Sequence, residues 1–180
     1  MEYSDNSYGD NFADIYDEWY RDLDNIDEVV ALVLSLAENG SVYELGIGTG
    51  RLALPIALAG ESSGVRVSGI DSSQAMLDQL AAKPRAELID AQLGHMVRDM
   101  APGPFSVVLL AYNTLFNLLS AQEQQECLTV APSRWPLADT SLLIALYPAQ
   151  TCQSTVAQPP IAVHHAVTSQ AKYMWTRHSN

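Results

Sequence analysis

The segment at residues 42–50 combines residue types that suit a ligand-binding loop. It reads Val-Tyr-Glu-Leu-Gly-Ile-Gly-Thr-Gly, a short apolar run that contains a carboxylate and leads into three glycines at alternate positions. Such a run predicts a buried parallel strand, and glycines beyond its carboxyl end let the backbone approach a ligand closely. We therefore expect a ligand at the end of this strand, close to Glu44.

The spacing of the glycines separates the ligand classes. A loop that cradles nucleoside triphosphates needs Gly-x-x-x-x-Gly-Lys-Ser/Thr, and no lysine stands at that position. The dinucleotide fingerprint Gly-x-Gly-x-x-Gly needs a glycine where this chain has Arg51. The pattern Gly46-x-Gly48-x-Gly50 instead suits a ligand with an amino-acid part and a ribose. An NAD-dependent oxidoreductase is therefore the most distant of the functions considered.

A second carboxylate follows at a distance that suits a ribose. Residues 65–70 predict another strand, and Asp71 comes directly after it. In a doubly wound sheet the carboxyl ends of these two strands lie side by side. A carboxylate on the second strand can then accept hydrogen bonds from the ribose hydroxyls of a nucleoside held at the first. Residues 72–77 continue as Ser-Ser-Gln-Ala-Met-Leu.

The glycine loop preceded by Glu44, Asp71 and the Ser-Ser-x-x-Met-Leu segment together resemble the class I S-adenosylmethionine-dependent methyltransferases over about residues 10–130. The resemblance implies an α/β fold: a doubly wound, mostly parallel Rossmann-like sheet with helices on both faces. It also implies S-adenosyl-L-methionine as the methyl donor and a small-molecule acceptor, which corresponds to a transferase of class EC 2.1.1.-. The expected catalytic effect is the positioning of donor and acceptor in line, so no catalytic residue is assigned.

The resemblance also assigns roles to residues around the donor. The backbone of residues 46–50 is expected to hold the methionine part, Glu44 its ammonium group and Asp71 the ribose, while Met76 packs on adenine. Where the family has an acid for the adenine amino group this chain has His95, so the adenine partner stays open between His95 and nearby Asp99. The expected donor-binding residues are Glu44, Gly46, Gly48, Gly50, Asp71, Ser72, Met76, His95, Met96 and Tyr16.

The acceptor side is expected after the fourth strand and under the first helix. Tyr112, Asn113, Thr114 and Phe116 stand where the family's acceptor pocket begins, and Tyr112, Asn113 and Phe116 are expected to line it. An alternative is that Asn113 and Thr114 only cap the following turn of helix. On the first helix, Tyr16 and Tyr20 form either a lid over the donor or an aromatic packing face.

The composition restricts which classes of binding partner we expect. The net charge of −12 repels nucleic-acid phosphates, and the sequence has no cluster of Lys or Arg, so we expect no nucleic-acid partner. Cys127 and Cys152 match no metal or redox spacing, and adjacent His164 and His165 diverge, so we expect no metal. The apolar stretch at 29–37 is too short to span a membrane and no leader is visible, which predicts a reduced, cytoplasmic protein. The sequence leaves the oligomeric state open.

The hydrophobic pattern divides the chain into alternating helices and strands. The expected organisation is one methyltransferase-like domain, residues 1–180, with a helical cap at 1–40, a donor-binding core at 41–130 and a divergent tail at 131–180. Helices are predicted at 10–21, 26–38, 51–59, 73–82 and 120–130, and strands at 42–45, 65–70, 86–93, 105–111 and 141–147.

The last third of the chain departs from the family pattern. Residues 1–127 carry 20 of the 21 acids, every glycine lies at or before Gly103, and five of the nine prolines follow residue 127. One alternative is an abnormal end from a shifted reading frame, which would leave a non-catalytic or truncated nucleoside-binding remnant. The other is a genuine divergent tail with a terminal strand pair at 161–167 and 172–177. Translation of the encoding DNA in the other two frames separates them.

Overall fold

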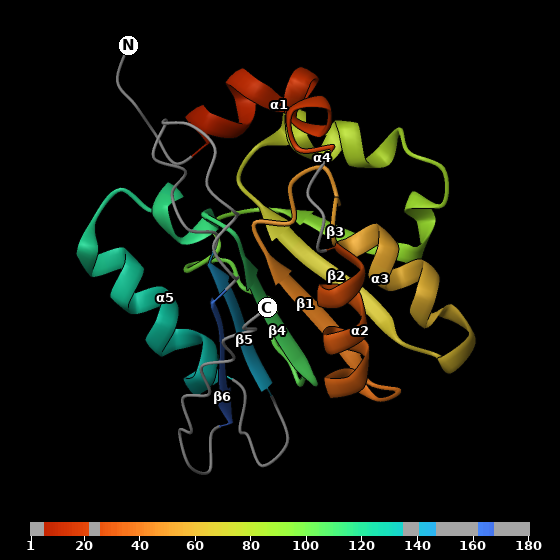
Figure 1. Cartoon of the computed structure of the whole chain (residues 1–180). Coiled ribbons are helices and arrows are strands. Elements are labelled where there is room, and N and C mark those ends of the chain that lie inside the picture. Colours follow the sequence, from red (N-terminus) through yellow and green to blue (C-terminus); the bar gives the residue numbers. More distant parts are fainter. Residues whose placement is uncertain (1–5, 22–25, 135–140, 147–161, 168–180) are drawn as a thin grey trace, which may run out of the picture.

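A six-stranded sheet forms the centre of the molecule. The computed structural model describes residues 6–21, 26–134, 141–146 and 162–167, with side chains described up to residue 129. The strands are β1 (Ser41–Leu45), β2 (Arg66–Asp71), β3 (Ile89–Leu93), β4 (Val107–Ala111), β5 (Ser141–Leu146) and β6 (Ala162–Val167). Their order is β3-β2-β1-β4-β5-β6 (Figure 1). The first five strands are parallel and β6 runs antiparallel to β5, which confirms the predicted fold class.

Helices cover both faces of this sheet, with α2 and α3 on one side and α5 on the other (Figure 1). The helices are α1 (Ser7–Trp19), α2 (Ile26–Ala37), α3 (Ala53–Gly60), α4 (Gln74–Ala81) and α5 (Ala121–Arg134). Three short 3-10 helices are η1 (Glu61–Ser63), η2 (Ala86–Leu88) and η3 (Thr114–Asn117).

The strand sequences explain why the sheet is covered on both sides. Side chains alternate along a strand, so Val42 packs toward α2 and α3 whereas Tyr43 and Leu45 pack toward Cys127 of α5. The five residues of β4 are all buried and divide between the two faces in the same way. Continuous apolar runs of this kind are typical of parallel strands that are buried on both faces.

The topology fixes where a ligand site can form. Strands β2 and β4 lie on opposite sides of β1, so the chain reverses its direction of progress across the sheet at β1. In open α/β sheets, ligands bind beyond the carboxyl ends of the strands at such a reversal point. The glycine loop that follows β1 occupies this position.

Helix α1 packs against α4 above this loop (Figure 1). The Ser73 hydroxyl donates to Asp10 Oδ1 at 2.7 Å and also accepts from the Met76 amide at 3.2 Å as the N-cap of α4. Further along α1, Asp17 forms an ion pair with Lys83 and accepts a hydrogen bond from the Thr49 hydroxyl at 2.6 Å. Polar contacts therefore connect α1 to both the glycine loop and α4.

Several element boundaries differ from the sequence prediction. Helix α1 begins at Ser7 rather than at residue 10, and β3 begins at Ile89 because residues 86–88 form η2. Helix α5 begins at the predicted Ser120 cap, where the Glu123 amide donates to the Ser120 hydroxyl at 3.1 Å, but continues to Arg134.

The tail contributes two strands to the sheet. The predicted strand at 141–147 is present as β5 and pairs in parallel with β4. The predicted strand at 161–167 is present as β6, and its partner is β5. The other member of the predicted terminal pair, 172–177, lies outside the described residues. The sheet thus continues through residues 141–146 and 162–167.

Candidate methyl-donor site

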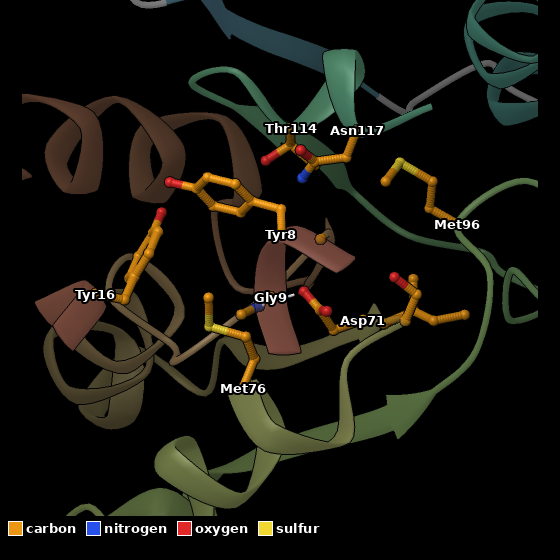
Figure 2. A pocket seen from close by; sticks show the side chains of 12 residues that line it. Tyr8, Gly9, Tyr16, Asp71, Met76, Met96, Thr114 and Asn117 are labelled. Atoms are coloured by element: carbon orange, nitrogen blue, oxygen red, sulfur yellow. Dashed lines mark hydrogen bonds between the residues drawn. The ribbon is translucent and has the colours of Figure 1, made fainter. Parts of the chain in front are cut away.

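A cavity lies at the carboxyl ends of β1, β2 and β4, with one wall formed by α1 (Figure 2). Its volume is about 50 Å³, and it opens to solvent on one side. The lining residues are Tyr8, Gly9, Tyr16, Gly46, Gly48, Ile70, Asp71, Ser72, Met76, Met96, Thr114 and Asn117.

The three loop glycines have different surroundings although all are left-handed. Gly46, Gly48 and Gly50 have φ values of +69°, +54° and +73°, a region that L side chains rarely adopt. A Cβ at Gly46 would overlap Thr114, and one at Gly50 would overlap Leu80. A Cβ at Gly48 would meet no atom closer than 3.9 Å. Gly48 is therefore the loop glycine that leaves open space beside the cavity.

Asp71 joins the second strand to this loop. One carboxylate oxygen accepts from the Gly48 amide at 2.8 Å, and the other accepts from the Ser73 amide at 2.9 Å. Burial raises the pKa of Asp71, although the amides of Ser73, Gly48 and Ser72 oppose the rise. A carboxylate has about four lone-pair sites, so with these three amides bound Asp71 keeps acceptor capacity for about one hydroxyl group.

Glu44 is a second buried carboxylate, placed at the end of β1. It is 5% exposed, and its Oε2 atom has no hydrogen-bond partner among the described residues. Burial raises its pKa to about 8; Arg51 opposes the rise and Asp71 adds to it. The free carboxyl is therefore mostly protonated near pH 7, and a cation bound beside it would favour its charged form.

Arg51 lies among three tyrosine rings. Its guanidinium carbon is 4.1 Å from the centre of the Tyr112 ring, 5.4 Å from Tyr20 and 5.9 Å from Tyr16. Sequence reasoning used Arg51 only to exclude a dinucleotide and assigned it no role. Arg51 comes directly after a loop predicted to hold an amino acid, and that position of a cation could have indicated a role in binding the ligand.

Tyr8 and Tyr16 form the aromatic wall that α1 contributes (Figure 2). The Tyr8 and Tyr20 hydroxyls are 3.2 Å apart, and the rings of Tyr16 and Tyr20 are 4.7 Å apart. Burial raises the pKa of Tyr16. The same aromatic face of α1 therefore both packs within itself and lines the cavity, so the two alternatives for Tyr16 and Tyr20 do not exclude each other.

His95 has another local role in the structure. Its Nδ1 accepts from the amides of Val97 and Arg98 at 3.2 and 3.4 Å, so Nδ1 carries no proton. Its own amide donates to Asp99 Oδ2 at 2.8 Å, and Nε2 lies 3.7 Å from Glu123. Neither His95 nor Asp99 is among the cavity-lining residues, whereas Met96 is.

The comparisons with known proteins agree with this geometry. The family model of a methyltransferase domain matches residues 42–131, from β1 into α5. A solved CcbJ methyltransferase from Streptomyces caelestis is 36% identical, with a TM-score of 0.70, over 92% of this chain and 69% of that one. This chain belongs to the methyltransferase domain family. Its function is S-adenosylmethionine-dependent methyl transfer.

More distant structures share the fold alone. The glycopeptide N-methyltransferase MtfA is 19% identical with a TM-score of 0.57, over 79% of this chain and 69% of that one. A TehB-like SAM-dependent methyltransferase from Corynebacterium glutamicum is 16% identical with a TM-score of 0.63, over 79% and 74%. No curated protein matches the chain in a sequence search.

The methyltransferase cavity includes most of the donor residues expected from sequence. Those that line it are Gly46, Gly48, Asp71, Ser72, Met76, Met96 and Tyr16. Glu44 is buried below the loop, Gly50 packs on Leu80, and His95 lies in its own turn. Tyr8 and Gly9 line the cavity without having been predicted, because α1 begins before residue 10.

Of the residues after β4 that were placed at the acceptor pocket, Thr114 lines the cavity together with Asn117, whereas Tyr112, Asn113 and Phe116 do not. Tyr112 has a left-handed φ of +55° and turns its ring onto Arg51, and Phe116 is 61% exposed. The change of backbone direction at Tyr112 and the 3-10 turn η3 present the neighbouring positions instead. Asn113 makes no side-chain cap to that turn.

Within the part of the chain that the structure describes, two further features are not found. No group of three or more His, Cys, Asp or Glu side chains has the arrangement of a metal site. No helix combines the length and the apolar character that crossing a bilayer requires.

Gly48→Ala is expected to reduce donor affinity at least tenfold while the protein still folds. The left-handed backbone costs about 1–2 kcal/mol with any side chain, and the new methyl group would project into the open space beside Asp71. Gly64→Ala is the matched control, because Gly64 has a φ of +81° with nothing within 4 Å. Urea unfolding should show similar losses for both variants, and calorimetry should show weaker binding only for Gly48→Ala. Equal donor affinity in the two variants would contradict this role.

Proposed function

We propose that this methyltransferase binds S-adenosylmethionine in the cavity between α1 and the carboxyl ends of β1, β2 and β4. Asp71 accepts hydrogen bonds from the ribose hydroxyls, Glu44 faces the ammonium group, and Met76 and Met96 pack on the adenine ring. The observation that carries the proposal is the pair of interacting carboxylates, the buried Glu44 and the half-buried Asp71, which both keep acceptor capacity beside the open Gly48.

The chemistry of these residues fits the donor. S-adenosylmethionine supplies a methyl group on a sulfonium, which a nucleophile removes in an in-line displacement. The ammonium group of its methionine part would pair with Glu44, whose Oε2 atom has no other partner among the described residues. The ribose would use the remaining acceptor capacity of Asp71. Because Gly48 has no side chain, the ligand can approach the protein backbone closely there.

The contribution of the protein to catalysis is then positioning and exclusion of water. Holding two reactants in line is worth up to about 7 to 11 kcal/mol. Tyr8 and Tyr16 from α1 cover the cavity on one side, and Thr114 and Asn117 after β4 offer polar groups on another (Figure 2). We place a small-molecule acceptor between these two walls. No side chain is assigned as a general base.

The organisation of the chain follows from this assignment. We propose one methyltransferase domain with residues 1–40 as the cap, 41–130 as the donor-binding core and 131–180 as the divergent tail. The proposed cap includes α1, which supplies Tyr8 and Tyr16 to the cavity. A cytoplasmic location is part of the proposal, supported by Cys127, a buried thiol whose pKa burial raises to about 11.

A methyl-transfer assay tests the proposed function. The purified protein is incubated with methyl-labelled S-adenosylmethionine and a panel of small amines, alcohols, phenols and acids, with Asp71→Ala as the background. Label transferred to one acceptor class supports an active enzyme. Donor binding without transfer to any acceptor supports the nucleoside-binding remnant. Binding of NAD in place of S-adenosylmethionine would overturn the assignment.

A further inference from the structure

Arg51 has an unusual environment for a cation. The Nε and Nη1 atoms of its guanidinium are buried and have no hydrogen-bond partner among the described residues. Buried donors without a partner cost about 1–3 kcal/mol each and are rare in folded proteins. The flanking rings of Tyr112, Tyr20 and Tyr16 stabilise the charge. The side chains of Tyr112 and Tyr16 also hydrogen-bond to the guanidinium, while its Nε and Nη1 atoms remain unpaired.

Glu44 carries an opposite charge but does not meet this need. It interacts electrostatically with Arg51, yet the two side chains form no ion pair within 4.0 Å, and Glu44 Oε2 also lacks a partner. A buried acid and a half-buried base therefore influence each other, and each keeps an unsatisfied buried atom. A ligand that carries both an ammonium and a carboxylate would satisfy both.

The position of Arg51 connects this pair to the cavity. Arg51 follows Gly50 directly, and one of its flanking rings, Tyr16, is also a cavity-lining residue. On the other side, Tyr112 holds its ring over the guanidinium with a φ of +55°. That backbone conformation is strained for a bulky residue, and such strain is found mainly at functional sites.

We infer that Arg51 binds the carboxylate of the donor's methionine part, so that Arg51 and Glu44 together recognise its zwitterionic end. A guanidinium offers two parallel N–H groups to a carboxylate, and its plane can stack on aromatic rings while doing so. The tyrosines fix the orientation of Arg51; Tyr16 belongs to α1, and Tyr20 directly follows that helix. The inference rests on the proposed function, because it concerns the same ligand in the same cavity.

A three-ligand titration tests the inference. Calorimetry compares S-adenosylmethionine, its decarboxylated analogue and methylthioadenosine, which lacks the whole amino-acid end, on the wild-type protein and on Arg51→Met. The wild type should prefer S-adenosylmethionine to the decarboxylated analogue by roughly 10- to 100-fold. Arg51→Met should lose that preference while its affinity for methylthioadenosine stays within about twofold of wild type.

Two further variants keep the result interpretable. Arg66→Met removes an exposed arginine at the opposite end of β2 and should leave all three affinities unchanged. Arg51→Lys keeps the charge without the paired N–H groups, should retain part of the preference, and replaces Arg51→Met if that variant does not fold.

The possible outcomes distinguish the inference from the proposed function. A wild type with no preference for the carboxylate, or an Arg51→Met variant that keeps it, overturns the inference. Equal loss of all three ligands in Arg51→Met also overturns it, because Arg51 would then act only by holding α1. A folded wild type that binds none of the three ligands contradicts the proposed function itself.

Discussion

Replacing Asp71 with alanine is expected to weaken binding of S-adenosylmethionine by about 1–3 kcal/mol, roughly 5- to 150-fold. The substitution removes the acceptor for the ribose hydroxyls. It also removes the acceptor of the Gly48 and Ser73 amides, which lie 2.8 and 2.9 Å from the carboxylate. Loss of the loop contact should lower the affinity for adenosine and for S-adenosylmethionine alike. Isothermal titration calorimetry with both ligands measures the two changes.

Asp90→Ala is the matched control for this variant. Asp90 lies on the neighbouring strand β3 and is exposed, so its removal changes the net charge equally without touching the cavity. We expect its donor affinity to equal that of the wild type. If Asp71→Ala binds the donor as tightly as Asp90→Ala does, Asp71 does not hold the ribose.

Glu44→Gln is expected to raise the stability of the free protein and to reduce the further stabilisation that S-adenosylmethionine gives. The pKa of Glu44 is about 8 in the folded state against 4.5 for an ordinary glutamate. Because the folded state binds the proton more tightly, this group lowers stability progressively as pH rises from about 4.5 to about 8. The full effect of such a shift would be up to roughly 5 kcal/mol. Glutamine removes it.

Thermal unfolding measures this prediction. The unfolding temperature of free Glu44→Gln should match the wild type near pH 5 and exceed it increasingly up to about pH 8, since the wild type must then bury a charge. With S-adenosylmethionine present, the variant should gain less stabilisation than the wild type, because glutamine cannot pair with the ammonium group. Glu28→Gln, at an exposed position of α2, should show neither effect. A pH-independent difference for Glu44→Gln would contradict the assigned pKa.

Local sequence predicted the donor side of the site well. The positions of Gly46, Gly48 and Asp71 follow from the order of strand, loop and strand, and the Asp71 carboxylate meets the Gly48 amide in the structure. Each of these residues lies within a few positions of a strand end, where short-range pattern determines placement. Helix α4, predicted at 73–82, is present at Gln74–Ala81.

The acceptor side depends on tertiary contacts that the pattern does not contain. The left-handed backbone at Tyr112 redirects the chain, so Thr114 and Asn117 line the cavity, whereas Tyr112, Asn113 and Phe116 do not. Glycine is a poor helix former, so Gly9 in the sequence argues against a start of α1 before residue 10. Its absent side chain is explained by Ser73 of α4, whose Cβ would lie 2.5 Å from a Cβ at Gly9.

A co-crystal structure with S-adenosylhomocysteine tests most directly whether the cavity is the donor site. The account predicts that the ribose hydroxyls lie within hydrogen-bond distance of Asp71 and that the amino-acid end passes Gly48 toward Glu44. Electron density for the ligand at another place, or a fully bound ligand whose ribose makes no contact with Asp71, would contradict it.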